Sequence, residues 1–344
     1  MSNHVLLEIG LEELPARFID NAEQQLYDYT VNWLDDMHIE YGVVQTFSTP
    51  RRLTVRIEKI ATYQTTINEE VRGPQLKIAK DENGEWTKAA IGFCKGQGQS
   101  PDDIYVKKIN ESEYIFIEKK TEGKETISLL PELKEIVSSI HFPQTMRWGN
   151  NTYRYARPIR WLVAVCNDQI IPFEIAGVKT GNTSYGHRFL GDSVTIVSPL
   201  DYEQLLEDQY VYVSPLKREQ TILHQIKEIE EKEGFHIQVE PALLNEVRNL
   251  VEYPTTFFGT FSEKYLQLPE EALITSMAEH QRYFPVMNKQ DHTLLPYFVS
   301  VRNGDEQQIG NVVKGIIPFF LIMLFGLILI ILIPELSTTL VKYR

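Results

Sequence analysis

The sequence predicts an α+β protein, with a soluble body of mixed strands and amphipathic helices followed by one C-terminal transmembrane-like helix. Two observations predict the body. Apolar residues recur every three or four positions in some segments, which is typical of amphipathic helices, and they alternate with polar residues in others, which is typical of strands. A third observation predicts the final helix, since residues 315–334 are twenty positions without a charged side chain. At helical rise this run is about 30 Å long, which is the thickness of a bilayer core.

These patterns divide the chain into four regions. Residues 1–140 are predicted to form an N-terminal α+β region with a β-rich insertion near residues 63–128. Residues 141–314 should form a strand region rich in arginine and aromatic residues, followed by a helical region. The apolar helix at 315–334 and a short polar tail at 335–344 complete the chain.

The N-terminal elements are a strand and a helix. Residues 5–10 form a short apolar run, which predicts a strand. The next apolar residues keep helical spacing, as one buried helix face requires: Phe18, Ala22, Leu26, Tyr29, Trp33 and Met37. Residues 53–58 then alternate apolar and polar side chains, which predicts a strand with one face in water.

Patterns farther along the chain predict both element types. Further strands are predicted at residues 114–118, 159–165 and 297–301, and a helix is predicted from Pro131. The long segment at residues 199–280 is predicted to be mostly helical.

Charge and cysteine content limit the function. The formal net charge is −13, which argues against indiscriminate binding to nucleic acid or to anionic lipid. The two cysteines, Cys94 and Cys166, are 72 positions apart and support neither a disulfide framework nor a zinc cluster. A reducing cytosol and the lack of an export signal predict a cytoplasmic body.

One stretch departs from this acidic background. Residues 136–167 contain no acidic side chain, and arginines alternate with aromatic residues there: Arg147, Trp148, Tyr153, Arg154, Tyr155, Arg157, Arg160 and Trp161. Guanidinium groups grip phosphates and aromatic rings stack on bases, so the stretch is a candidate phosphate track. The alternative is an arginine-lined domain seam, in which Trp148 and Trp161 are core residues and the arginines pair with carboxylates. Composition leaves both interpretations open.

Two further sites carry histidine and arginine. His187 and Arg188 lie between glycines, and His280 and Arg282 end a predicted helix. A phosphate or interface contact is one interpretation of each pair, while a hydrogen-bonded turn or a helix C-terminus is the structural alternative. Glu12 and Glu13 are predicted to cap the following helix. The sequence shows binding residues but no recognisable catalytic set.

Ordered strings then carry a resemblance. They are Leu7 to Gly10, Glu12 to Ala16, Thr49 to Leu53, Arg72 to Pro74, Phe142 and Pro143, Met146 to Trp148, Arg157 to Leu162, Gly186 to Phe189, Val251 to Pro254, Glu279 to Pro285 and Val301 to Gly304. Together they resemble the β subunit of bacterial heterotetrameric glycine-tRNA ligase.

The resemblance implies an α2β2 enzyme that joins glycine to tRNA(Gly). It implies that ATP, with Mg, is used through the α subunit, so neither a bound cofactor nor a catalytic residue is expected on this chain. The β subunit is expected to contact tRNA and the α subunit. The candidate contact residues are Arg147, Trp148, Arg154, Arg157, Arg160, His187, Arg188, His280 and Arg282.

The C-terminal part departs from this family. Family members continue beyond this point into an anticodon-binding domain, whereas residues 316–340 resemble a spanning helix of a membrane permease. A truncated synthetase subunit is therefore expected. The alternative is a tail-anchored RNA- or protein-binding module, with residues 316–333 inserted in the membrane.

Overall fold

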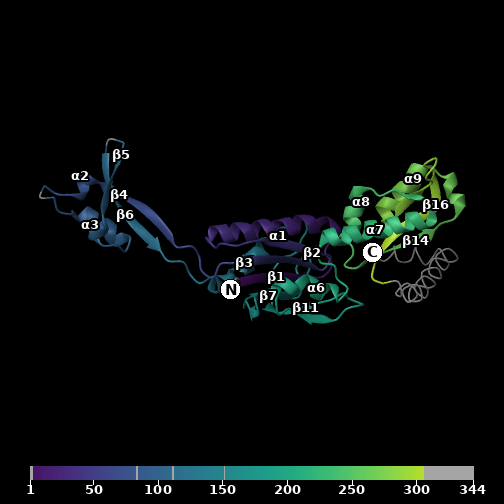
Figure 1. Cartoon of the computed structure of the whole chain (residues 1–344), viewed down its shortest axis with the longest axis horizontal. Helices are drawn as coiled ribbons and strands as arrows, with labels where there is room; N and C mark the ends of the chain where they lie inside the picture. The colour runs from purple at the N-terminus through teal and green to yellow at the C-terminus, as the bar shows by residue number, and fades with distance from the viewer. Residues whose placement is uncertain (1–2, 83, 111, 151, 306–344) are drawn as a thin grey trace, which may run out of the picture.

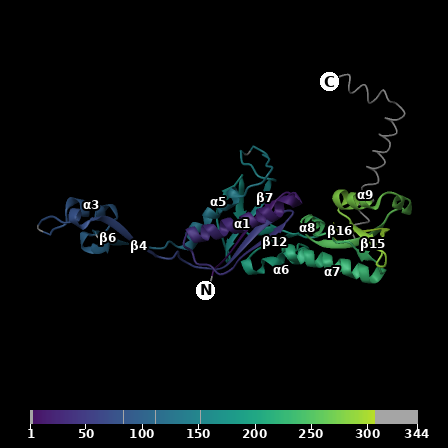
Figure 2. The same cartoon turned by 90° about the horizontal axis from the view of Figure 1, so that it is seen from above.

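A computed structural model describes residues 3–82, 84–110, 112–150 and 152–305. Figures 1 and 2 show three parts in a row: a central body, an arm on one side and a distal lobe on the other. We define the arm as residues 67–121 and the distal lobe as residues 214–305. The rest of the described chain forms the body, and the mixture of sheets and helices confirms the α+β class.

The body is built on a seven-stranded sheet. Its strands run in the order β2-β3-β1-β7-β10-β9, and β8 pairs with β7. The bounds are β1 (Asn3–Leu11), β2 (Val44–Thr49), β3 (Arg52–Ile60), β7 (Ile159–Cys166), β8 (Gln169–Ile170), β9 (Glu174–Ile175) and β10 (Val178–Gly181). A separate hairpin joins β11 (Thr183–Tyr185) to β12 (Ser193–Thr195).

Helices cover both faces of this sheet. The helices and turns are α1 (Ala16–Asp36), α4 (Thr126–Leu129), η2 (Leu130–Glu132), α5 (Leu133–Ser139), η3 (Pro199–Asp201) and α6 (Tyr202–Glu207). Val5, Leu7 and Ile9 of β1 pack with α1 and α5, while Leu6 points to the opposite face and packs with α6. Because both faces are covered, β1 is apolar from Val5 to Leu11 except at Glu8.

The prediction that one face of β3 is exposed to water is wrong. Thr54 is fully buried and shares a hydrogen bond with Tyr202, at 2.9 Å between the two hydroxyl oxygens. Arg56 is also buried and pairs with Glu203 at 3.2 Å. Helix α6 covers this face, and it follows almost 150 residues later in the sequence, so the local alternation could not reveal it.

The arm has a small sheet of its own. Its strands β4 (Ile67–Gln75), β6 (Ser112–Thr121) and β5 (Tyr105–Ile109) lie in the order β4-β6-β5. Helices α2 (Leu76–Ala79) and α3 (Lys88–Gly96) pack on them, with a turn η1 (Pro101–Asp103). Figure 1 shows the arm projecting from the body on the long strands β4 and β6.

The distal lobe packs helices on a four-stranded sheet, in the order β13-β15-β16-β14. Helix α7 begins after Ser214, whose hydroxyl accepts from the Lys217 amide, and ends at Gly234, whose positive φ terminates the helix. The bounds are α7 (Pro215–Glu233), β13 (His236–Ile237), α8 (Pro241–Arg248), β14 (Pro254–Thr260), η4 (Glu263–Gln267), α9 (Glu270–Thr275), η5 (Ser276–Gln281), β15 (Phe284–Met287) and β16 (Leu294–Asn303).

Residues 199–280 are mostly helical, as predicted, but the strand β14 among them was not predicted. Pro254 stands at its first position, where a missing amide hydrogen is tolerated, and two threonines and two phenylalanines follow. The β-branched and aromatic residues were the signal for a strand. The strand pairs with β16 along its whole length.

The predicted membrane-type helix at 315–334 lies outside the described residues. Within the described ranges, no helix combines the length and the apolar character needed to cross a bilayer.

Candidate functional site

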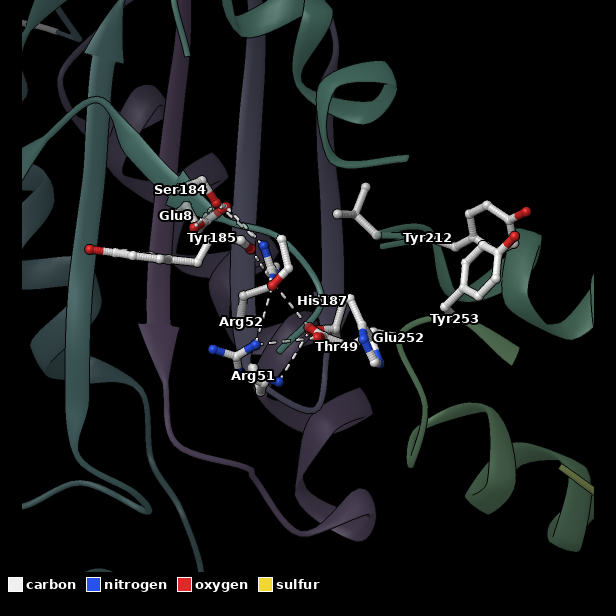
Figure 3. A network of polar contacts seen from close by, with 12 residues as sticks. Glu8, Thr49, Arg51, Arg52, Ser184, Tyr185, His187, Tyr212, Glu252 and Tyr253 are labelled. Carbon is white, nitrogen blue, oxygen red and sulfur yellow. Dashed lines mark hydrogen bonds and ion pairs between the residues drawn. The ribbon is translucent and has the colours of Figure 1, made fainter. Parts of the chain in front are cut away.

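A buried polar network lies where the body meets the distal lobe (Figure 3). Glu8 of β1 accepts hydrogen bonds from the hydroxyl groups of Ser184 at 2.7 Å and Tyr202 at 2.6 Å. The indole Nε1 of Trp161 donates to the same carboxylate. Since none of the Glu8 side chain is exposed, these donors replace the water that an isolated buried charge would require.

Arg52 joins this carboxylate to a second one. Its Nη1 lies 3.8 Å from Glu8, and its Nη2 lies 3.0 Å from Glu252, which belongs to the distal lobe. Glu252 also accepts a hydrogen bond from the Thr49 hydroxyl at 2.7 Å. Figure 3 shows Arg52 between the two carboxylates, so one guanidinium connects the body sheet to the lobe.

The electrostatics keep this network charged. Burial by itself would raise the pKa of Glu252, but Arg52 and Arg51 outweigh it and hold the pKa below its ordinary value. Burial would lower the pKa of Arg52, yet Glu252 and Glu8 hold it above the ordinary value. The lowered pKa of Glu252 and the raised pKa of Arg52 both favour the ionised form of this pair.

A second buried cation crosses the same seam. Arg218 of α7 donates to the backbone carbonyl oxygens of Ser48 at 2.8 Å, Tyr212 at 2.7 Å and Arg248 at 2.9 Å. Burial lowers the pKa of Arg218 to about 10. The network around Arg52 is closed to solvent in the same way, so these groups join the two parts and cannot receive a substrate.

The depressed pKa of Glu252 predicts acid sensitivity. At pH values between the ordinary pKa of a glutamate and the lowered pKa of Glu252, the unfolded chain binds more protons than the folded chain. The free energy of unfolding therefore falls as the pH drops through this range. We expect the urea midpoint to fall between about pH 5 and pH 3, with a smaller fall in Glu252→Gln. Tryptophan fluorescence during urea titrations at several pH values measures this. Equal pH profiles for the two proteins would contradict it.

An open pocket lies beside the closed network. Its volume is about 330 Å³, and it is lined by Leu11, Glu12, Arg51, Arg160, Trp161, Tyr185 and Arg188. Three guanidinium groups and two aromatic rings therefore meet at one surface. We call this the arginine pocket.

Glu12 lies across the arginine pocket. One of its oxygens is 3.3 Å from Arg160 Nε, and the other is 3.0 Å from Arg188 Nη2. Arg157 donates to the backbone carbonyl of Glu13 at 3.0 Å and so holds the loop that carries Glu12. The predicted capping role of Glu12 and Glu13 is wrong, because helix α1 begins at Ala16 with no acidic residue in its first turn.

The loop that carries Arg188 is tightly packed. A Cβ atom on Gly186 would lie 2.6 Å from the Cβ of Gln209, and one on Gly191 would lie 2.4 Å from the Gln209 carbonyl oxygen. The His187 amide donates to that carbonyl at 2.9 Å. Because Gly186 and Gly191 have no side chain, the segment around Gln209 can pack directly against the loop that carries Arg188.

The other candidate residues lie apart from the pocket. Arg147, Trp148 and Arg154 belong to the loop before β7, where the Trp148 ring packs edge-on against Tyr153 and Arg154 donates to Thr145. His187 is 1% exposed, and burial lowers its pKa, which favours the structural interpretation of this histidine.

His280 and Arg282 are in the distal lobe, whereas β7 and β11 belong to the body (Figure 1). Arg282 Nη2 pairs with Glu246 at 2.8 Å. The pocket beside Arg282 is also lined by Glu240 and Glu279. This acidic environment is unfavourable for a phosphate.

Sequence reasoning missed Arg51 as a pocket residue and Glu8 as the centre of the network. Both had a signal in the sequence. Glu8 is a charge inside an apolar strand, and Arg51 and Arg52 are adjacent cations at the start of another strand. A charge in a buried strand requires a partner, and no local pattern names that partner.

The fold and the site define a class, an α+β protein with a surface pocket lined by arginines and aromatic rings. The family model described as "Glycyl-tRNA synthetase beta subunit" matches residues 5–317, so the chain belongs to that family of aminoacyl-tRNA synthetase subunits.

Curated relatives carry the name "Glycine--tRNA ligase beta subunit". The chain is 56% identical to that of Oceanobacillus iheyensis over 315 residues, which are 92% of this chain and 45% of the relative. It is 54% identical to that of Halalkalibacterium halodurans over 310 residues, 90% of this chain and 45% of the relative. For Bacillus subtilis the identity is 49% over 311 residues, 90% of this chain and 46% of the relative. The chain spans less than half the length of these relatives.

Proposed function

We propose that this chain acts as a β subunit of glycine-tRNA ligase. In this role it supports the ATP-dependent attachment of glycine to tRNA(Gly) through contacts with tRNA and with the α subunit. The observation that carries the proposal is the match over residues 5–317, together with 56% identity to a relative of that name. Both extend over the body, the arm and the distal lobe.

The proposal assigns the chemistry to the α subunit. Use of ATP and Mg then belongs to that subunit, and this chain contributes binding surfaces in the cytoplasm, where tRNA is charged. The arginine pocket supports a binding role, because exposed guanidinium groups form charge-assisted hydrogen bonds with phosphate. The sequence-based candidates Arg160 and Arg188 both lie there, and Arg51 joins them.

Charge reversal of the pocket tests this role. We expect Arg160→Glu combined with Arg188→Glu to weaken binding of glycine tRNA by about tenfold or more, because two phosphate contacts become repulsive. The measurement is filter binding of labelled tRNA to the chain copurified with the α subunit. A matched control is Lys227→Glu with Lys232→Glu, which makes the same charge change on exposed positions of α7.

The outcomes of this test are distinct. Equal tRNA binding by the pocket variant and the α7 variant would contradict a tRNA role for the pocket. Failure of the unchanged chain to copurify with the α subunit would contradict the proposed subunit role. Thermal unfolding of each variant controls for loss of fold.

Membrane insertion of residues 316–333 is a prediction from the sequence alone, and the chain offers a direct test of it. A run of twenty uncharged residues predicts recovery of the expressed protein with membranes. Alkaline extraction followed by sedimentation measures this, and recovery in the soluble fraction would contradict it. With anchoring but no tRNA or α-subunit binding, the alternative of a tail-anchored module would replace the proposal.

A further inference from the structure

We propose that the arginine pocket binds a phosphate group of single-stranded RNA, and that the Glu12 carboxylate occupies the phosphate position in the free chain. This inference rests on the proposed function, because it names the part of the partner that the site receives. It adds a residue of the chain itself as a competitor for that site.

The contacts of Glu12 outline the position of an anion. Arg160 lies in β7 and Arg188 in the loop after β11, yet both pair with one carboxylate: Arg188 donates to it at 3.0 Å, and Arg160 forms an ion pair with it at 3.3 Å. Arg51 lines the same pocket, and its Nε is buried without a hydrogen-bond partner among the described residues. A phosphate has more acceptor oxygens than a carboxylate, so it can receive donors from all three arginines.

Exposure decides which arginines can exchange partners. The side chains of Arg160 and Arg188 are 61% and 43% exposed, and Glu12 is 39% exposed. Ion pairs in water contribute little, because solvent screens them, and so an incoming phosphate displaces Glu12 at small cost. Arg52 differs, since neither it nor Glu8 is exposed and their pair cannot open without breaking the core.

The cationic groups are already held in place. The packed loop between Gly186 and Gly191 fixes the backbone of Arg188, and Arg51 donates to the Gly186 carbonyl at 3.3 Å. Arg51 also lies 3.6 Å from buried Glu252. Pre-positioned donors lose less conformational entropy on binding, which favours a specific site over a diffuse basic surface.

Aromatic rings favour a nucleotide over a simple anion. Tyr185 is 44% exposed and stands edge-on to Trp161, with ring centroids 5.0 Å apart. An exposed ring beside guanidinium groups allows a base to stack while its phosphate is gripped. The pocket volume of about 330 Å³ lies at the lower end of the usual range of about 300–1,000 Å³ for small-ligand sites. It suits one nucleotide unit of an unpaired strand.

The test measures fluorescence anisotropy of a labelled eight-nucleotide single-stranded RNA with the full chain. We expect Glu12→Gln to bind this RNA about fivefold more tightly, because the internal competitor is gone. Glu203→Gln is the matched control, since it removes the same charge from another exposed glutamate, which lies on α6 and pairs with the buried Arg56. A gain in Glu12→Gln no larger than that in Glu203→Gln would overturn the proposal.

A second arm tests the arginines directly. Arg160→Gln combined with Arg188→Gln should weaken RNA binding at least tenfold and lower the salt dependence, by about 0.7 in log–log slope per lost phosphate contact. Thermal unfolding confirms that the variant is folded. Unchanged affinity in a folded variant would overturn the proposal.

Competition and copurification separate the remaining outcomes. AMP should displace the RNA at lower concentration than inorganic phosphate, and equal potency would overturn stacking on Tyr185. Copurification with the α subunit is measured on the same samples. If the chain binds the α subunit but the Glu12 and arginine variants leave RNA affinity unchanged, only this inference fails. If the Glu12 and arginine variants change RNA affinity as expected but the chain does not bind the α subunit, the proposed subunit role fails instead.

Discussion

Replacing Glu252 by alanine is expected to weaken the contact between the body and the distal lobe by about 3–5 kcal/mol. The substitution leaves Arg52 with half of its ionic partners, and Arg52 is fully buried. It also removes the acceptor of the Thr49 hydroxyl. An uncompensated buried charge costs far more than the loss of a surface pair, so the effect should be among the largest for a single substitution.

Urea denaturation followed by tryptophan fluorescence measures the effect of Glu252→Ala. Trp161 reports on it directly, because its ring lies 5.6 Å from the Arg52 guanidinium carbon. Glu246→Ala is the control, since it breaks a half-exposed ion pair with Arg282 in the same lobe and should cost at most about 1 kcal/mol. Similar midpoints for the two variants would refute a stabilising role for the buried network.

Replacing Gly10 by alanine is expected to destabilise the body by about 3 kcal/mol, near the upper end of overpacking costs. Gly10 pairs directly with Trp161 across β1 and β7, and an added Cβ would lie 1.9 Å from the indole ring. The ring cannot move aside freely, because it donates to Glu8 and packs in the core under α6. The clash therefore disturbs both the sheet and the buried network.

Gly181→Ala is the control for this substitution. Gly181 lies in β10 of the same sheet, and an added Cβ there meets no atom within 4 Å. Its stability should change by at most about 0.5 kcal/mol. Thermal unfolding by circular dichroism compares the two variants, and an unchanged midpoint in Gly10→Ala would show that Trp161 can repack.

Four arginines near the junction of the body and the distal lobe differ in solvent access. Arg52 and Arg218 are fully buried and hold the distal lobe to the body. Arg160 and Arg188 are exposed and both pair with the exposed carboxylate of Glu12. The structural interpretation of the arginine-rich stretch holds for Trp161, which is a core residue. Arg160 lines the arginine pocket, and phosphate binding there stays a prediction.

Much of the secondary structure could be predicted from local patterns. The predicted strands at residues 114–118, 159–165 and 297–301 lie within β6, β7 and β16. Within the segment predicted to be mostly helical, Ile222 and Ile226 of α7 lie in the core of the distal lobe. Strand β14 was missed because its helical neighbours dominated the interpretation of a long segment, although its threonines and phenylalanines favoured a strand.

The candidate site was predicted only in part for a different reason. Arg160 and Arg188 carried local signals in the form of neighbouring aromatic residues and glycines, whereas Glu12 was taken for a helix cap. Its contact with Arg188 joins residues 176 positions apart. A contact of that range leaves no mark in local periodicity.

The amino-acid sequence by itself determined the α+β composition, the order of most elements and the family resemblance that the comparisons confirm. Only the tertiary structure decided which charges are buried and which remain available. The physical reason is that burial depends on what covers a residue: Arg52 is sealed by Glu252, 200 positions away, while Arg160 meets only an exposed glutamate. Side chains of one chemical type therefore hold the fold in one place and remain open to solvent in another.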